Sequence, residues 1–278
     1  MTETGDYRHA KCYANLHGGC ATKISGEHYV SHNLIKLYTF DDPTVTILHD
    51  NGYGIPRPVK PKEFVANVLC RDHNSLLSPA DDAALAFATF LRRIALSYLN
   101  GNGTWGEDET IEISGDDFQR WVLKLLATHA AASAFAAGGK RVVSPIPDDA
   151  VHLLLDKAAW PRTWGLCVAK EPGNSYLKYD PFSDIATVLT DWWSAHPFFA
   201  TSDNALCGGV VELAGVGFGL SLYNQGRGLP EFDNPDNPLK GSIQRPAYME
   251  WVLNNVRKRI NFSWQDNSQI FGVTYIMD

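Results

Sequence analysis

The sequence contains few cysteines, no long apolar segment and no marked excess of one charge. Five cysteines in 278 residues form an odd and sparse set, which is not the pattern of a disulfide framework. No run of 18 apolar residues occurs, and the N-terminus lacks the basic-then-apolar order of a signal peptide. We therefore expect a soluble cytoplasmic protein with no membrane partner.

The charge balance provides no general attraction toward nucleic acid. The formal net charge is −7 at pH 7, so any binding to phosphate groups must depend on a local group of basic residues. Most surface charges of this kind simply face water. The candidate basic residues are Arg57, Lys60, Lys62, Arg71, Arg92, Arg93, Arg257, Lys258 and Arg259.

Hydrophobic patterning predicts an α+β protein. Ser78-Pro79 followed by Asp81 is typical of a helix start, and the apolar spacing continues the helix to about Leu99. Residues 114–139 predict a second helix, closed by a glycine pair. Further segments have strand-like or helical composition. They comprise a hairpin in 44–55 around Asn51-Gly52, a short strand in 64–69, a helix in 146–160, and strands in 164–169, 205–215, 216–223, 259–264 and 270–276.

The glycine-rich and polar stretch at 100–110 is the best candidate for a linker. It divides the chain into an N-terminal module, 1–105, and a C-terminal domain, 106–278, of mixed helices and antiparallel strands. We expect the two parts to fold as separate units. The role of the C-terminal domain is open: it can select substrate, bind a protein partner or form a homodimer.

Three cysteines and one histidine of the N-terminal module form a potential metal site. Cys70-x-x-His73 has the spacing of a ligand pair, and Cys12 and Cys20 complete a Cys₃His set that suits tetrahedral zinc. His17 is a competing ligand. The alternative is a loop with free thiols and surface histidines. Cys167 and Cys207 lie in apolar runs and are interpreted as small buried hydrophobic residues.

The order of these residues resembles the HNH endonucleases that have a zinc-stabilised ββα-metal core. The resemblance covers about residues 9 to 80. Glu27-His28 corresponds to the acidic-His pair of that family, Asn67 to its middle asparagine, and Asn74 to its final His or Asn. The sequence departs from the family pattern in three ways: glutamate stands at position 27 where aspartate is usual, His73 replaces a zinc cysteine, and the first cysteine pair is widely spaced.

The resemblance implies metal-dependent hydrolysis of phosphodiester bonds in DNA or RNA. His28 would act as the general base, and Asn67 would orient it. Glu27 and Asn74 would hold one magnesium or manganese ion through oxygen atoms, and this ion would stabilise charge on the phosphate. Because adjacent helical residues differ by about 100° in direction, His73 could bind zinc while Asn74 faces the second ion.

Two other functions remain open at this point. The chain can be a catalytically inactive zinc-binding module that recognises nucleic acid or protein. It can also be an unrelated enzyme with its site in the C-terminal domain, but the sequence contains no glycine-rich phosphate loop, nucleophile elbow or HExxH motif. Because Glu27, His28 and Asn74 are all present, the endonuclease is the first hypothesis.

Overall fold

The computed structural model describes most of the chain and contains both helices and strands. The described residues are 7–39, 42, 44–49, 55, 57–101, 103–137, 140–170, 177–179, 186–188, 192–222, 245–266 and 270–277. The predicted α+β class is confirmed. No helix in these ranges is long and apolar enough to cross a membrane.

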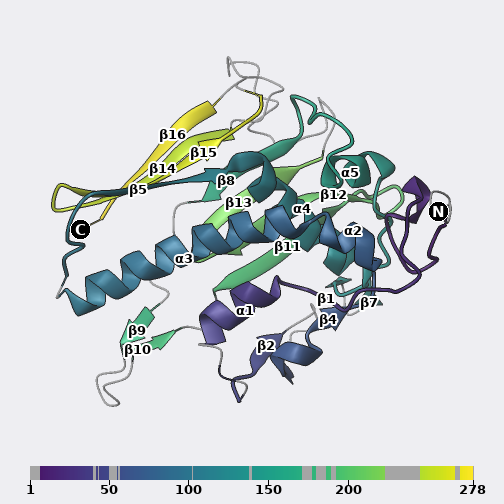
Figure 1. Cartoon of the computed structure of the whole chain (residues 1–278), viewed down its shortest axis with the longest axis horizontal. Helices are drawn as coiled ribbons and strands as arrows, with labels where there is room; N and C mark the ends of the chain where they lie inside the picture. Colours follow the sequence, from purple (N-terminus) through teal and green to yellow (C-terminus); the bar gives the residue numbers. More distant parts are fainter. Residues whose placement is uncertain are drawn as a thin grey trace, which may run out of the picture. The chain divides into compact units, whose positions relative to one another are not determined.

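The helices fall mainly in the first part of the chain (Figure 1). The α-helices are α1 (His32–Thr39), α2 (Arg71–Ser75), α3 (Ser78–Asn100), α4 (Gly115–Ala131) and α5 (Asp148–Leu154). Two short 3-10 helices are η1 (Asn15–His17) and η2 (Pro61–Glu63). The structure therefore contains the helix predicted to begin near Ser78, and α5 lies within the predicted 146–160 helix.

The described strands form short pairs and two larger sheets. The strands are β1 (Glu27–His28), β2 (Ile47–His49), β3 (Arg57–Val59), β4 (Val65–Ala66), β5 (Glu109–Ser114), β6 (Ala136–Ala137), β7 (Lys140–Arg141), β8 (Gly165–Lys170), β9 (Leu177–Tyr179), β10 (Ala186–Val188), β11 (Trp193–Phe199), β12 (Leu206–Leu213), β13 (Val216–Ser221), β14 (Arg245–Leu253), β15 (Val256–Ser263) and β16 (Ile270–Ile276). The larger sheets have the orders β11-β12-β13-β8 and β16-β14-β15-β5. Figure 1 shows the strands of the second sheet side by side.

The second sheet is mixed rather than purely antiparallel. Strands β14 and β15 pair antiparallel, whereas β16 joins β14 and β5 joins β15 in parallel. Strand β5 begins at Glu109, so the last residues of the predicted linker belong to a strand. Only 101–108 separate α3 from β5.

The chain forms two compact units, each assembled from three segments. Unit 1 consists of Met1–Asp81, Arg120–Trp160 and His196–Gly209, and unit 2 of Asp82–Gln119, Pro161–Ala195 and Val210–Asp278. The boundaries fall inside α3, α4, β11 and β12. The predicted division between 105 and 106 concerns independent folding, and it stays a prediction.

Helix α4 is shorter than the apolar pattern of 114–139 predicts. It ends at Ala131, after which Ser133 has a left-handed φ of 50° and the amide of Ala134 bonds to the carbonyl of His129. A helix interior does not accommodate such a residue, so the chain turns there and continues into β6. The expected closing pair, Gly138-Gly139, lies outside the described residues.

Unit 1 holds β1 against a small apolar core. Strand β1 pairs antiparallel with β4, placing Glu27 opposite Ala66 and His28 opposite Val65. Because side chains alternate along a strand, neighbouring residues face opposite sides, and here Glu27 is buried whereas His28 is half-buried. Apolar side chains of α1, α4 and the segments around α2 are buried in the same unit. They include Leu34, Ile35, Leu69, Leu77 and Trp121.

Unit 2 has its own aromatic core. Phe87 of α3 and Phe118 of α4 pack on Phe218 of β13, with ring centroids 4.9–5.4 Å apart. Phe262 of β15 joins the same group. All four phenylalanines are buried, which accounts for the apolar spacing on the two helices.

Candidate metal centre and neighbouring ion network

Four residues of unit 1 form a buried cluster that can hold a structural metal ion. The sulfur atoms of Cys12, Cys20 and Cys70 and a ring nitrogen of His73 all lie within 4.8 Å of one another. Each of these residues is less than 5% exposed. The structure thus brings together the four residues that the sequence predicts as ligands.

The distances inside the cluster match one tetrahedral ion better than hydrogen bonds. Nδ1 of His73 lies 3.4 Å from Sγ of Cys12, 3.7 Å from Sγ of Cys20 and 3.3 Å from Sγ of Cys70. One ring nitrogen offers a single proton or a single lone pair, so it cannot bond to three thiols at once. Ligands at the usual Zn–S and Zn–N distances are about 3.6 Å apart along a tetrahedron edge.

The electrostatics of the cluster also require a cation if the thiols are to ionise. Burial, together with the neighbouring sulfurs of Cys70 and Cys20, raises the pKa of Cys12 to about 12. Burial lowers the pKa of His73 below its ordinary value, which keeps the ring neutral as a ligand must be. A bound divalent ion would favour the thiolates that burial otherwise opposes.

Local turns bring the two ends of the cluster together. Gly18 and Gly19 have φ values of 67° and 65°, in the left-handed region that glycine adopts without strain. The chain therefore reverses just before Cys20, whose amide bonds to the carbonyl of Tyr7. Cys70 forms a bridge with Ile24 and then starts α2, so His73 lies one turn further along the helix.

His17, the competing ligand, is not part of the cluster. Its ring contacts that of His152 edge-on, with the centroids 4.1 Å apart. Burial and the neighbouring His152 lower the pKa of His17.

A second polar group lies around Glu27. The ammonium of Lys124 is 2.7 Å from Oε1 of Glu27 and 2.8 Å from Oδ2 of Asp81. The side chains of Lys124 and Glu27 are only 5% and 6% exposed. Burial lowers the pKa of Lys124, but the carboxylates of Asp81 and Glu27 outweigh this effect and leave it above its ordinary value of 10.5. A single cation therefore bridges two carboxyl groups in an environment with little water.

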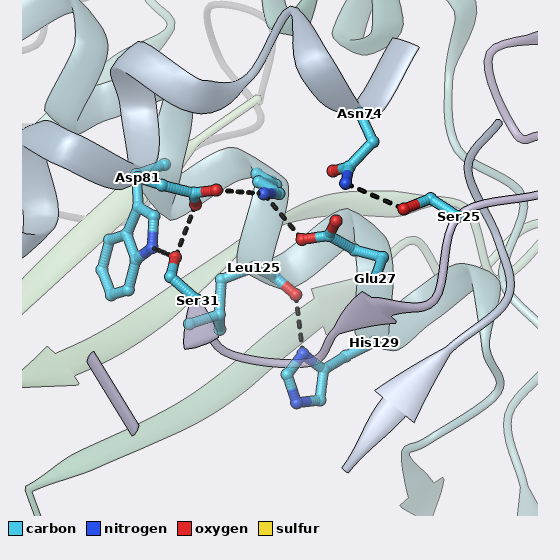
Figure 2. Close-up of polar contacts among 9 residues, drawn as sticks. Ser25, Glu27, Ser31, Asn74, Asp81, Leu125 and His129 are labelled. Carbon is cyan, nitrogen blue, oxygen red and sulfur yellow. Dashed lines mark hydrogen bonds and ion pairs between the residues drawn. The ribbon is translucent and has the colours of Figure 1, made fainter. Parts of the chain in front are cut away.

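Two further residues fix the Asp81 side of this network. Ser31 donates a hydrogen bond to Oδ1 of Asp81, and Nε1 of Trp121 donates one to Ser31 at 3.0 Å. Figure 2 shows Glu27 of β1, Ser31 of the connection between β1 and α1, and Asp81 of α3 close to one another. Asp81 lies in the first turn of α3, and its carboxylate is turned toward Lys124 and Ser31.

Asn74 lies beside Glu27. Its Nδ2 donates to Oγ of Ser25 at 3.0 Å, and its amide is close enough to Glu27 to lower the pKa of that carboxyl (Figure 2). Among the residues that the structure describes, Oδ1 of Asn74 is buried without a hydrogen-bond partner. Burial raises the pKa of Glu27, and the ammonium of Lys124 opposes that rise.

His28 is near this network but is not a ligand of the cysteine cluster. Its ring stacks on that of His32, with the centroids 4.5 Å apart. Burial, His32 and Lys124 lower the pKa of His28 to about 4, so the ring is neutral at pH 7. Within the described part of the chain, its Nε2 is buried and has no hydrogen-bond partner.

Asn67 directly follows β4 and is exposed. It lies one residue beyond Ala66, the partner of Glu27 in the strand pair. The orienting role expected for Asn67 toward His28 stays a prediction.

Sequence reasoning missed Lys124 and the role of Asp81. The signal for Lys124 was a single lysine inside the apolar stretch "WVLKLLA" of α4. Trp121 and Lys124 are three residues apart and therefore lie on one face of the helix. A cation on an otherwise apolar helix face requires a buried anion as its partner.

The candidate phosphate-binding residues differ in their surroundings. Arg57, Lys60, Lys62 and Arg71 are exposed on unit 1. In the 257–259 run of unit 2, Lys258 is buried and pairs with Glu109 at 3.3 Å. Arg259 lies 3.6 Å from the ring centre of Tyr248 and pairs with Glu250 at 3.8 Å. The four exposed residues of unit 1 are therefore better candidates than Lys258 and Arg259.

Comparisons of the chain with models of protein families, with curated proteins and with solved structures gave no match. The geometry described above is consequently the basis on which a function is proposed.

Proposed function

We propose that residues 9–80 form a zinc-stabilised module of the HNH type, and that the protein is a metal-dependent endonuclease. One observation carries the proposal. The Cys₃His cluster lies at the start of α2, and Asn74, the residue after His73, lies beside the buried Glu27. This placement supports the two-site arrangement that the resemblance implies for residues 9–80.

In the proposed reaction, the protein supplies a base and the ligands for an ion. His28 accepts a proton from the water that attacks phosphorus, and the bond to the 3′ oxygen breaks. Glu27 and Asn74 would hold magnesium or manganese, which would stabilise negative charge on the phosphate. The unpartnered oxygen of Asn74 fits that role. The ammonium of Lys124, which contacts Glu27, disfavours a second cation there.

The protonation state of His28 affects how well it can perform this step. With a pKa of about 4, the ring is neutral at pH 7 and can accept a proton. A base whose pKa is well below the working pH is a weak one. We therefore expect slower cleavage than from a histidine whose pKa lies near 7.

Substrate phosphates would meet exposed cations on unit 1. Arg57 and Lys60 lie at β3, Lys62 on η2, and Arg71 begins α2 directly after the zinc ligand Cys70. Cations at such positions neutralise phosphates without reading sequence. Either DNA or RNA therefore fits this proposal.

A second candidate function is nucleic-acid or protein recognition without cleavage. The observation that favours it is the buried ammonium of Lys124, which lies on Glu27 where a catalytic ion would bind. In that case the Cys₃His site would serve only to stabilise the fold.

Cleavage and binding assays separate the two candidates. Zinc-loaded protein is incubated with plasmid DNA, single-stranded DNA and RNA in magnesium, manganese or nickel, with EDTA as the control. Ion-dependent cutting supports the endonuclease. Binding in a gel-shift assay without cutting under any ion supports the recognition module. If the protein neither cuts nor binds any of these substrates, a role on nucleic acid is contradicted.

A further inference from the structure

Lys124 occupies a position that resembles that of a bound cation. Its Nζ lies 2.7 Å and 2.8 Å from oxygens of Glu27 and Asp81. Magnesium and calcium lie about 2.0–2.6 Å from carboxylate oxygens. The ammonium thus fills nearly the same space between the two carboxylates that an ion would fill.

The side chains around Lys124 have the chemistry of a hard-cation site. Glu27 comes from β1, Asp81 from α3 and Asn74 from α2, so three elements contribute oxygen atoms. The Oδ1 of Asn74 is buried and has no donor among the described residues. Two carboxylates and an amide oxygen are ligands that magnesium and manganese prefer.

Lys124 is held in this position by its helix and by its surroundings. It lies in the middle of α4, three residues after the buried Trp121, whose indole donates to Ser31. Its side chain is 5% exposed. To leave, the ammonium would have to abandon both carboxylates and find another partner, which is costly for a buried charge.

We propose that Lys124 is an internal cation that competes with a divalent ion for Glu27, Asp81 and Asn74. An ion entering beside the ammonium meets a like charge at close range, and one that displaces it must compensate for the lost ion pairs. The protein as it stands therefore binds magnesium and manganese weakly at these oxygens. The inference deepens the proposed function, since it takes Glu27 and Asn74 as the ligands of that ion.

Manganese binding to the full-length, zinc-loaded protein tests the proposal. Free Mn²⁺ is measured by electron paramagnetic resonance during titration of the wild type, Lys124→Met and Lys124→Arg. Methionine keeps an unbranched side chain of nearly the same length and removes the charge, and arginine keeps the charge. We expect Lys124→Met to bind manganese on the order of 10- to 100-fold more tightly than the wild type, and Lys124→Arg to bind as weakly as the wild type.

The site of binding is checked with a second substitution. Adding Glu27→Gln to Lys124→Met should remove the gain in affinity, because an amide is a poorer ligand than a carboxylate. Equal affinity of the wild type and Lys124→Met would overturn the proposal. So would a gain that persists in the double variant.

Zinc content and near-ultraviolet circular dichroism establish that each variant is folded. If Lys124→Met does not fold, Lys124→Gln replaces it, because glutamine can donate a hydrogen bond to one carboxylate. If neither variant folds, the manganese titration of the wild type is the test. If the wild type is half-saturated below about 0.1 mM manganese and Glu27→Gln loses this binding, the proposal is contradicted. Half-saturation of the wild type at a higher manganese concentration supports it.

The result is separable from that of the proposed function. The manganese titration contains no nucleic acid, whereas the cleavage and gel-shift assays ask whether DNA or RNA is bound and cut. If the protein neither binds nor cuts nucleic acid, but Lys124→Met binds manganese more tightly than the wild type, only the proposed function is contradicted. A protein that cuts DNA and shows no such gain contradicts only the competition by Lys124.

Discussion

Lys124 of α4 and Glu27 of β1 form a buried ion pair with an N–O distance of 2.7 Å. The two residues are nearly 100 positions apart in the sequence, so this pair exists only in the folded unit 1. Asp81 accepts a second contact from the same ammonium at 2.8 Å. Because Lys124 and Glu27 are buried and Asp81 is only partly exposed, the folded state is sensitive to the loss of any one of them.

Removing the charge of Lys124 should destabilise the protein. In Lys124→Met, Glu27 and Asp81 remain close together without a cation, and such losses cost about 3–5 kcal/mol. Because the pKa of Lys124 lies above 10.5, its contribution is complete at neutral pH and is lost only as the pH rises above that value. The measurement is urea unfolding at pH 7.

The matched control for this prediction is the double variant Lys124→Met with Glu27→Gln. It removes the charge of Glu27, the buried one of the two carboxylates, so it should recover part of the lost stability. If both variants unfold at the wild-type urea concentration, the ion pair contributes nothing measurable.

Acid should destabilise the protein through His129. This residue is 1% exposed, and burial lowers its pKa from 6.5 to about 4. A lowered folded-state pKa means that the unfolded chain binds the proton first. Stability is therefore complete above pH 6.5 and is lost as the pH falls toward 4, by about 3 kcal/mol.

Unfolding of His129→Phe from pH 7 to pH 4 tests this prediction. Phenylalanine fits beside Phe135, whose ring stacks on His129 with the centroids 5.4 Å apart. The variant should lose less stability between these pH values than the wild type. His196→Gln, at an exposed position, is the control and should follow the wild-type curve. Parallel curves for all three proteins would be evidence against the role of His129.

The fold class could be predicted because local patterns suffice for it. Apolar spacing indicated α3 and α5, and short apolar, strand-like segments indicated β8, β12 and β16. Strand β14 was missed although it lies between β15 and β16. It begins with Arg245-Pro246 and contains Glu250. These residues are uncommon in strands, and β14 is buried because of its neighbours in the sheet rather than its own composition.

The metal cluster was predictable and the ion network was not, for a physical reason. Thiolates and imidazoles are rare enough that Cys12, Cys20, Cys70 and His73 indicate a site by their identity. Lysines and aspartates are common on surfaces, so the identity of Lys124 or Asp81 does not indicate a site, and the apolar neighbours of Lys124 indicate only that it needs some buried anion. Their role depends on how α3 and α4 pack around β1, which spacing within each helix does not specify.

Limited proteolysis should cut the chain between α3 and β5. The linker was predicted at 100–110. In the structure, Glu109 and Thr110 belong to β5, and the amide of Arg257 donates a hydrogen bond to the carboxylate of Asp108. The segment 101–107 is therefore the expected site of early cleavage. Mass spectrometry of the first fragments checks this. First cuts elsewhere would argue against two separately folding parts at the predicted boundary.

The purified protein should contain about one zinc per chain. Cys70→Ser removes one of the four ligands, so zinc content should fall and the thermal midpoint should drop, because metal binding contributes folding energy. Elemental analysis and a thermal scan make the measurement on protein purified without chelator. Cys167→Ser is the control: this cysteine lies on β8, outside the cluster, and should leave zinc content unchanged. Protein without zinc would rule out the site.

Cleavage, if the protein cuts nucleic acid, should depend on His28. His28→Ala should lower the rate by about 10²- to 10⁴-fold, the usual contribution of a positioned base, while zinc content stays at the wild-type level. Asn74→Ala should instead raise the magnesium concentration needed for half-maximal rate, since it removes an oxygen ligand. Single-turnover rates across a magnesium titration separate the two effects.

His32→Ala is the matched control for His28, because it removes the exposed ring that stacks on it. His32 helps to lower the pKa of His28 to about 4, so its loss should raise that pKa. The acid limb of the pH–rate profile should then move upward from about pH 4, while the rate at pH 7 stays within a few-fold of the wild type. A wild-type profile without any fall near pH 4, or a His28→Ala variant that cuts normally, would exclude His28 as the base.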